Sequence, residues 1–325
     1  MSSCLALFAS HLIRCSSARM YRVPFPARKV YEARPNARDR SFFAPEPRMT
    51  DRIAFQGEPG AYSHQACRET YPQLEALPCR TFEDAIDAVR SRRADLAMLP
   101  VDNSTFGRVA DIHHLLPASG LHIVNEAFVR VHINLLALPG TRLDQIERAT
   151  SHPMALGQCR EFLHAHGIHR VTGADTAGSA KLVAEQHDAS LAALASELAG
   201  EIYGLDVLAR HIEDQADNTT RFLVMAREPD LTRRGDHGMM TSFVFQVRNI
   251  PAALYKAMGG FATNGVNMTK LESYMVGGSF TATQFFADIE GHPDDRNVRL
   301  AMEELDYFTD RVELLGVYPA DRRRR

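Results

Sequence analysis

Hydroxyl, amide and imidazole side chains gather at three junctions where an apolar strand pattern ends and a polar turn begins. The junctions are Gly57-Glu-Pro-Gly-Ala-Tyr-Ser63, Asp102-Asn-Ser-Thr-Phe-Gly107 and Ser151-His-Pro-Met-Ala-Leu-Gly-Gln158. Each is predicted to open a helix, where free backbone N–H groups and the positive end of the helix dipole suit a carboxylate. Ordinary helix capping explains any one junction alone, but three in one domain favour a small anionic ligand.

The three junctions belong to a segment in which short apolar runs alternate with helical patterns. Strands are predicted at 52–56, 94–101, twice within 122–138, at 190–194 and at 220–225. Helices are predicted from Ala61, after a Thr81 cap with Asp84 three residues on, and from Pro153 to Gly167. This alternation predicts a layered α/β domain with a largely parallel sheet, whose ligands gather at the carboxyl ends of the strands.

A second segment has a different order of elements. The pattern predicts a strand, a helix, two strands, a helix and a strand at 242–247, 251–262, 266–273, 280–289, 295–307 and 312–318. This βαββαβ order is the ferredoxin-like arrangement. The domains therefore run from 52 to 227 and from 239 to 319, with a linker at 228–238 that contains proline, glycine and charged residues.

The charge of the chain is distributed unevenly. Residues 1–48 hold nine basic and three acidic side chains, a net charge of +6, so the remainder carries -9 of the total of -3. A body this acidic argues against a nucleic-acid partner, which requires a basic face. The run Arg322–Arg325 is predicted to be a solvated tail. No apolar run reaches the roughly 18 residues of a membrane helix, so no membrane partner is expected.

Cysteine and histidine spacing bears on the compartment and on metals. The five cysteines form no CxxC pair and are typical of reduced thiols, which predicts a cytoplasmic protein. No HExxH motif or Cys/His ligand cluster occurs, so no metal or other cofactor is expected. Residues 1–48 lack hydrophobic periodicity; they are expected to be a disordered leader or a start assigned upstream of Met49, and their Arg-rich composition also resembles a transit peptide.

Four motifs resemble, in order, the marker motifs of prephenate dehydratases. They are Gly57–Ser63, Pro100-Val-Asp-Asn-Ser104 with Gly107, Ser151–Cys159 and Asn218-Thr-Thr-Arg-Phe222. The second has Asp102 where the family usually has Glu. The resemblance implies two α/β subdomains arranged like a type II periplasmic binding protein, with the active site in the crevice between them.

The βαββαβ segment resembles the phenylalanine-sensing ACT domain that is joined to these dehydratases. The resemblance is carried by Asn249-Ile-Pro-Ala-Ala-Leu254 and Asn267-Met-Thr-Lys-Leu-Glu-Ser273. Two departures occur: Ala252-Ala253-Leu254 replaces the frequent Gly-Ala-Leu, and Glu272-Ser273-Tyr274-Met275 replaces Glu-Ser-Arg-Pro. These departures bear on the affinity and identity of the effector.

The resemblance implies loss of carbon dioxide and a ring hydroxyl from prephenate, which leaves phenylpyruvate. Aromatisation drives the reaction, so no cofactor is required as an electron sink. We expect Thr220 to donate a hydrogen bond to the departing hydroxyl. The expected substrate contacts are Ser63, Asn103, Ser104, Ser151 and Arg221, although strand alternation turns Arg221 away from Thr220. The expected effector contacts are Asn249, Ala253, Leu254, Asn267, Glu272 and Ser273, at an interface between two copies in a homodimer or homotetramer.

Two other functions compete with this interpretation. Arogenate dehydratase is the nearest, because arogenate has an amino group where prephenate has the keto oxygen. The second is a non-catalytic amino-acid sensor, since both domains resemble ligand-binding folds. The intact Thr220-Arg221-Phe222 signature argues against a sensor, which needs no leaving-group donor.

Overall fold

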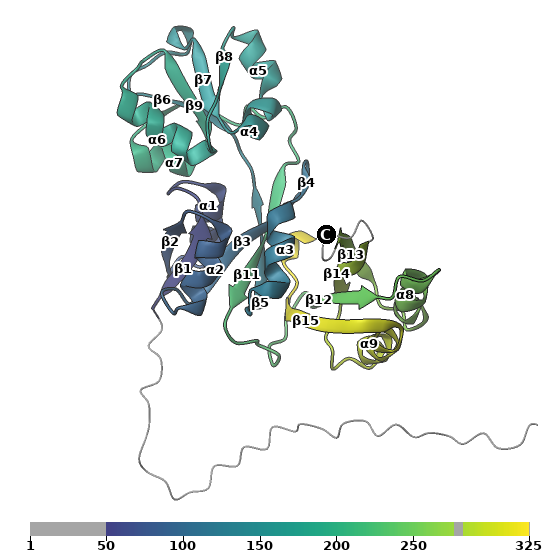
Figure 1. The fold of residues 1–325 in the computed structure, drawn as a ribbon. Helices are drawn as coiled ribbons and strands as arrows, with labels where there is room; N and C mark the ends of the chain where they lie inside the picture. Colours follow the sequence, from purple (N-terminus) through teal and green to yellow (C-terminus); the bar gives the residue numbers. More distant parts are fainter. Residues whose placement is uncertain (1–49, 276–281, 325) are drawn as a thin grey trace, which may run out of the picture. The chain divides into compact units, whose positions relative to one another are not determined.

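The computed structural model describes residues 50–275 and 282–324. Residues from Arg48 onward form one compact unit. The expectation of a disordered leader at 1–48 falls outside the described residues. The described unit contains a ten-stranded sheet, a five-stranded sheet and the helices that cover them (Figure 1).

The first subdomain is built around one end of the larger sheet. Its elements are β1 (Arg52–Gln56), α1 (Tyr62–Thr70), β2 (Glu75–Cys79), α2 (Phe82–Arg90), β3 (Leu96–Asn103), β4 (Gly107–Arg108), α3 (Ala110–Ala118), β5 (His122–Arg130) and β11 (Thr219–Ala226). Strands β2, β1 and β3 are parallel, whereas β11 runs antiparallel to both β3 and β5. The predicted cap of α2 is confirmed, because the Thr81 hydroxyl accepts from the Asp84 backbone N–H at 3.1 Å.

The second subdomain holds the smaller sheet, in the order β10-β6-β9-β7-β8. Its elements are β6 (Asn134–Ala137), η1 (Leu143–Gln145), β7 (Arg148–Ser151), α4 (Pro153–Gln158), α5 (Arg160–Ala165), β8 (His169–Thr172), α6 (Thr176–Gln186), β9 (Leu191–Ala195), α7 (Glu197–Tyr203) and β10 (Asp206–Ala209). The chain crosses between the subdomains twice, at 131–133 and at 210–218, and these crossings flank the space between the two sheets (Figure 1).

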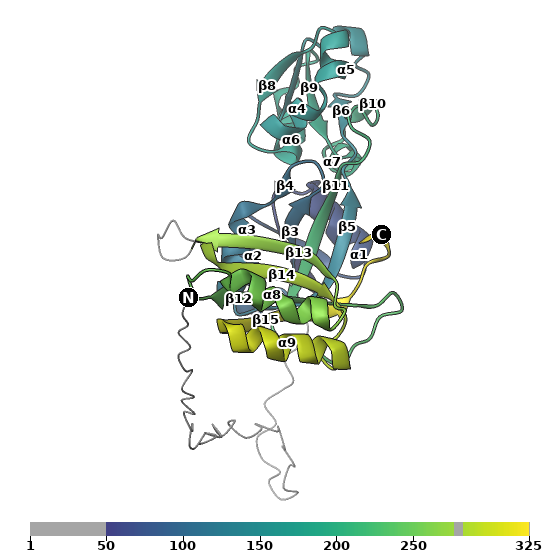
Figure 2. The ribbon, with the colours of Figure 1, turned by 90° about the vertical axis from the view of Figure 1, so that its right-hand side faces the viewer.

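The predicted βαββαβ order is confirmed in the remaining residues. The elements are β12 (Met239–Val247), α8 (Ala253–Thr263), β13 (Met268–Met275), β14 (Ala282–Glu290), α9 (Arg296–Phe308), β15 (Thr309–Pro319) and η2 (Arg322–Arg324). The strand order β13-β14-β12-β15 is that of a ferredoxin-like sheet. Helices α8 and α9 lie side by side against one face of it (Figure 2).

The ferredoxin-like module and the first subdomain share both a sheet and a core. β15 lies parallel to β5, with Gly316 opposite Ile123. A Cβ at Gly316 would lie 2.1 Å from the Ile123 carbonyl oxygen, so only glycine permits this approach. Buried side chains of both parts, including Leu223 and Phe286, form one hydrophobic cluster.

Several predicted elements differ from those observed. The segment 102–107 forms the tight turn of the β3–β4 hairpin, with Asn103 opposite Gly107, and does not open a helix. The two strands within 122–138 belong to different sheets, because the chain crosses between subdomains after β5. The helix predicted from Pro153 to Gly167 is two short helices that meet at Cys159. The sheets are mixed, with three parallel strands in each subdomain.

The prediction of a solvated arginine tail is wrong for Arg324. Its side chain is only 16% exposed and lies within hydrogen-bond distance of two buried carboxylates. Charge patterning along the chain could not reveal this position, because the partners, Glu126 and Asp288, are distant in sequence.

Candidate active site

A cavity of about 280 Å³ lies between the two subdomains and contains side chains from all four motifs. Its walls come from β1, α1, β3 and β11 on one side, and from α4 and the start of α6 on the other. The lining residues are Gln56, Gly57, Ala61, Tyr62, Ser63, Pro100, Asn103, Phe106, Val109, Val131, Ile133, His152, Met154, Ala155, Gln158, Asp175, Thr176, Asn218, Thr220 and Phe222. None of these is lysine or arginine, so an anion here would depend on N–H groups, hydroxyls and amides.

Thr220 and Asn103 lie opposite each other on β11 and β3 and line this cavity. The Asn103 side-chain oxygen accepts from the backbone N–H groups of Thr105 and Phe106, both at 3.0 Å. Because that oxygen must face two donors, the amide nitrogen faces Thr220, and it donates to the Thr220 hydroxyl oxygen at 3.0 Å. The Thr220 hydroxyl is thereby left with its hydrogen available for another acceptor.

A β-bulge explains which residues of the two strands reach the cavity. Arg221 lies opposite Asp102, but Phe222 lies opposite Pro100, so Val101 is an extra residue on β3. On β11 the ordinary alternation holds: Thr220 and Phe222 line the cavity and Arg221 faces the other side.

Helix starts bring further polar groups to the cavity. Ser63 lies in the first turn of α1 and lines the wall. His152 caps α4: its Nδ1 accepts from the Met154 backbone N–H at 3.2 Å, so a neutral His152 carries its hydrogen on Nε2 and can donate. Asp175 caps α6 and accepts from the Gly178 N–H at 2.6 Å.

The glycine-rich motif also ties the two subdomains together. The Ser196 hydroxyl, at the start of α7, donates to the Gly60 carbonyl, and the Tyr203 hydroxyl donates to the Pro59 carbonyl at 2.9 Å. A Cβ at Gly60 would lie 2.7 Å from the Ala199 Cα. The motif therefore serves the contact between subdomains as well as the cavity wall.

Three of the expected substrate contacts are not brought to the cavity wall. Ser151 is fully buried and its hydroxyl donates to the Leu194 carbonyl at 2.7 Å, which links β7 to β9. The Ser104 hydroxyl donates to the Asp217 carbonyl at 2.6 Å, which ties the β3–β4 turn to the segment before β11. These two hydroxyls support the walls of the cavity.

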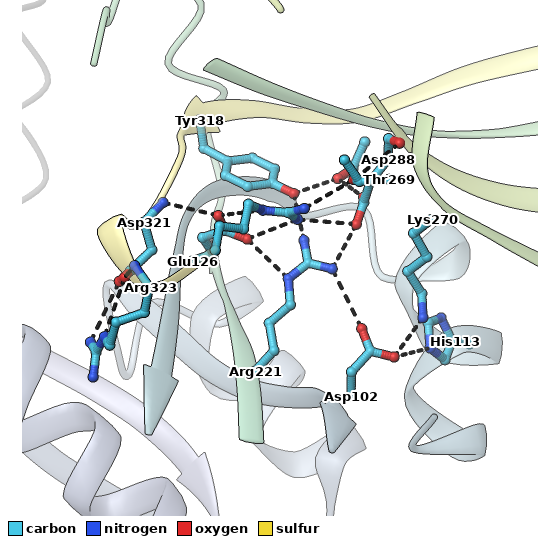
Figure 3. Close-up of polar contacts among 12 residues, drawn as sticks. Asp102, His113, Glu126, Arg221, Thr269, Lys270, Asp288, Tyr318, Asp321 and Arg323 are labelled. Carbon is cyan, nitrogen blue, oxygen red and sulfur yellow. Dashed lines mark hydrogen bonds and ion pairs between the residues drawn. The ribbon is translucent and has the colours of Figure 1, made fainter. Parts of the chain in front are cut away.

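Arg221 is the third, and it lies in a buried cluster of charges (Figure 3). Burial alone would lower the pKa of the Arg221 guanidinium, but the negative charges of Asp288 and Glu126 outweigh burial and raise its pKa above the ordinary value. Arg221 therefore stays charged and paired. A larger cavity of about 830 Å³ borders this cluster and lies apart from Thr220.

The expected effector residues lie in two places in the ferredoxin-like module. Asn249 is exposed in the turn before α8, where Ala253 is buried and Leu254 is partly buried. Asn267 directly precedes β13, the edge strand of the sheet, on which Glu272 and Ser273 lie. Glu272 pairs with Lys270 at 3.4 Å, and Arg108 of β4 donates to the Ser273 carbonyl at 3.3 Å. This strand thus contacts the hairpin that holds Asn103.

Asn218 and Asp175 are polar residues of the cavity wall that were not among the predicted site residues. Asn218 is 2% exposed, and its side-chain oxygen accepts from the Asn103 amide at 2.7 Å. Its position two residues before Thr220, within the fourth motif, was the available signal. Asp175 had a capping pattern, Asp175-Thr-Ala-Gly178, but nothing local placed it against the other motifs.

No group of three His, Cys, Asp or Glu side chains within 50–275 and 282–324 is arranged to hold a metal ion. None of the helices in these ranges combines the length and apolarity needed to cross a membrane.

Two α/β subdomains, joined by two crossings around a cleft that is lined by apolar and polar side chains, define a two-lobed fold of the type II periplasmic-binding-protein kind, here carrying a ferredoxin-like module. Residues 53–230 match the family model of prephenate dehydratase. The chain belongs to the prephenate dehydratase family, which are carbon–oxygen lyases.

Relatives cover both the catalytic subdomains and the module. A bifunctional N-acyl-homoserine lactone acylase/prephenate dehydratase of Komagataeibacter europaeus is 50% identical over 84% of this chain and 97% of its own length. Arogenate dehydratase/prephenate dehydratase 1 of Arabidopsis thaliana is 38% identical over 83% of this chain and 72% of its own. The crystal structure of the prephenate dehydratase of Arthrobacter aurescens in complex with L-Phe superposes with a TM-score of 0.76 at 31% identity, covering 83% of this chain and 90% of that one.

Proposed function

We propose that this chain converts prephenate to phenylpyruvate in the cleft between the subdomains, with Thr220 as donor to the departing hydroxyl. The observation that carries the proposal is the orientation of Asn103. Its amide nitrogen donates to the Thr220 oxygen, and the Thr220 hydrogen is left for an acceptor in the cleft. A hydroxide that receives a strong hydrogen bond leaves more easily.

The substrate carboxylates would be held by groups other than cations. Ser63 and the first-turn N–H groups of α1 lie on one wall, and Thr176 at the start of α6 lies on the other. Helix N-termini suit carboxylates because their N–H groups lack partners within the helix. Ser63, Asn103 and Thr220 are the proposed contacts of the substrate.

The direct test is the rate of phenylpyruvate formation by Thr220→Ala, with Thr220→Ser as the matched control. Removing one stabilising donor is expected to lower kcat by roughly a hundredfold or more, and serine keeps the donor. The far-UV circular dichroism of both variants should equal that of the wild type. A kcat for Thr220→Ala within a few-fold of the wild type would move the donor role to another residue, with His152 the next to test.

Arogenate is a second candidate substrate, because a carboxylate lies in the cleft. Asp175 lines the wall, and its carboxylate could pair with the amino group that distinguishes arogenate from prephenate. The Arabidopsis relative is named for both activities. Steady-state kinetics with both substrates separates the candidates: Asp175→Asn, which keeps a helix cap, should lower kcat/KM for arogenate and leave that for prephenate nearly unchanged.

We further propose that phenylalanine binds to the ferredoxin-like module as an ACT domain and that a second copy completes the site. The Arthrobacter relative was crystallised with L-Phe. In this chain the turn before α8, the first turn of α8 and the edge strand β13 expose apolar side chains, namely Ile250 (54%), Tyr255 (81%) and Met275 (58%). An edge strand offers unpaired backbone groups to a second copy.

This proposal is tested by titrating phenylalanine against both activity and mass in solution. The expected result is that the protein is a homodimer or homotetramer and that phenylalanine inhibits it. The coupling between the two sites should change the affinity for the substrate by roughly 5- to 150-fold. A monomer in sedimentation, or activity unchanged at millimolar phenylalanine, would contradict it.

A further inference from the structure

The face of β11 that turns away from the cleft carries a buried ion-pair cluster. The Arg221 guanidinium donates to Glu126 on β5 at 2.9 Å, to Asp288 on β14 at 2.6 Å and to the Tyr318 hydroxyl on β15 at 2.9 Å (Figure 3). It also lies 3.4 Å from Asp102 on β3. One side chain thus joins two strands of the first subdomain to two strands of the ferredoxin-like module.

Two more cations complete the charge balance of this cluster. Lys270 on β13 lies 2.5 Å from Asp102. Arg324 of η2 donates to both oxygens of Glu126, at 2.8 and 3.1 Å, and lies 3.4 Å from Asp288. The side chains of Glu126 and Asp288 are fully buried, so they depend on the two guanidinium groups that they share. Three carboxylates face three cations.

The titration of Asp288 is consistent with this arrangement. Burial alone would raise the pKa of the Asp288 carboxyl, but the positive charges of Arg221 and Arg324, together with the Ser242 hydroxyl, outweigh burial and lower its pKa. Asp288 is therefore ionised at neutral pH and needs both cations.

On both β11 and β3, the residue that belongs to the cluster is the direct neighbour of a residue that carries the proposed chemistry. Arg221 and Asp102 form one cross-strand pair, and Thr220 and Asn103 form the next. We propose that Arg324 is a positioning residue, which holds Arg221 and Asp102 in place and thereby fixes the spacing of Thr220 and Asn103 in the cleft. This inference rests on the proposed function of Thr220.

The physical reason lies in how the charges would redistribute. Without Arg324, the fully buried side chains of Glu126 and Asp288 would have the Arg221 guanidinium as their one remaining ion-pair partner among the described residues. Arg221 would then be drawn toward these carboxylates and away from Asp102. Because β11 and β3 carry both pairs, the 3.0 Å hydrogen bond between Asn103 and Thr220 would be loosened.

The experiment compares Arg324→Met with Arg323→Met as the matched control. Arg323 pairs only with the neighbouring Asp321, at 3.3 Å, among the ion pairs of the described residues, and its side chain is 52% exposed. Three quantities are measured in the full chain: kcat for prephenate, KM for prephenate, and backbone amide hydrogen exchange in the peptide spanning 217–226.

Arg324→Met is expected to lower kcat by about tenfold, because misplacement from a distant substitution can cost up to about a hundredfold. KM should change less than about twofold, and exchange in 217–226 should become faster. Arg323→Met should match the wild type in all three quantities. Arg324→Lys keeps the positive charge but lacks the forked donors of the guanidinium. Its kcat and its exchange rate in 217–226 should lie between those of Arg324→Met and the wild type.

Unchanged exchange in Arg324→Met would overturn the inference whatever the turnover. Faster exchange with unchanged kcat would overturn it too, because the cluster would then hold β11 without positioning Thr220. A wild type that does not convert prephenate would refute the proposed function, and since exchange does not depend on turnover, the two failures are distinguishable.

Discussion

Asn103 shows how a single side chain can orient another. Its oxygen is occupied by two backbone N–H groups of the β3–β4 turn, so its nitrogen is directed at Thr220. The tight turn is therefore part of the proposed catalytic arrangement. The position requires asparagine because its side chain has both an oxygen that accepts from the turn and a nitrogen that donates to the Thr220 hydroxyl.

Replacing Asn103 with aspartate should abolish this orientation while preserving the turn. Aspartate keeps an acceptor for the Thr105 and Phe106 N–H groups. Its second carboxylate oxygen, however, cannot donate to the Thr220 oxygen and instead accepts the Thr220 hydrogen. We expect kcat to fall by about a hundredfold or more in Asn103→Asp. Asn103→Ala, measured in parallel, loses the turn contacts as well but leaves the Thr220 hydrogen free. A higher kcat in Asn103→Asp than in Asn103→Ala would refute this account.

The buried position of His113 predicts that the free energy of unfolding depends on pH. It is 1% exposed, with Nδ1 at 2.9 Å from the Tyr274 hydroxyl, and Asp102, Lys270, Glu272 and Arg108 are the charged groups around it. Burial, followed by the charge of Lys270, lowers the pKa of His113. The unfolded chain therefore binds more protons below about pH 6.5, so stability falls as pH decreases through that range.

The free energy of unfolding should accordingly drop between pH 7 and pH 5.5, and His113→Gln should show a shallower drop. Denaturant titrations at both pH values measure the two slopes. Equal slopes in the two proteins would assign the pH dependence to other groups.

The sequence predicted which residues form the site better than it predicted where their side chains point. Thr220, Asn103 and Ser63 meet at one cavity, as expected from motifs that follow strands. Arg221 was misplaced because its partners Asp288 and Glu126 lie 67 and 95 residues away. No local sequence pattern predicts an ion-pair partner that is so distant in sequence. Strand alternation nevertheless predicted that the Arg221 and Thr220 side chains lie on opposite faces of the strand.

At the level of elements, the turn into α8 explains one departure from the family pattern. Ala252 has a φ of 61°, a left-handed conformation that glycine adopts without steric cost. The frequent Gly-Ala-Leu of related domains has glycine at this position. The alanine here therefore strains the backbone beside the proposed effector site.

Ala252→Gly should raise the free energy of unfolding by about 1 kcal/mol, because it removes this strain. Ala253→Gly is the matched control: Ala253 is the first residue of α8 and has helical backbone angles, for which glycine is less favourable than alanine by up to about 1 kcal/mol. The two neighbouring substitutions should shift the melting temperature in opposite directions. A decrease in both would show that Ala252 is not strained in solution.

Element boundaries that depended on local signals were predicted well, and those that depended on tertiary contacts were not. The Thr81 cap and the βαββαβ order follow from nearby residues. The hairpin at 102–107 depends on pairing of β4 with β3, and the break at Cys159 depends on the Asp214 carboxylate, which accepts from the Arg160 and Glu161 N–H groups. These partners cannot be read from the segments themselves.

At the scale of the whole molecule, the ferredoxin-like module is structurally inseparable from the catalytic part. A chain ending at residue 227 would lose Asp288, Tyr318 and Arg324 and would expose the apolar surface that packs against Phe286. Since breaking a buried ion pair alone costs about 3–5 kcal/mol, we expect this shortened chain to unfold at a much lower temperature than the full chain. Calorimetry of both chains is the measurement. Equal melting temperatures would mean that the catalytic part folds without the module.

The pairing of Arg221 with Arg324 through shared carboxylates also bears on synthesis. The ribosome makes residue 221 about 5 to 20 seconds before residue 324, at the usual rates of chain elongation. During that interval the nascent chain holds an incomplete set of charges, and β5 lacks the strand that will lie beside it. The catalytic half is therefore exposed to aggregation and to chaperones until translation has passed the last arginines.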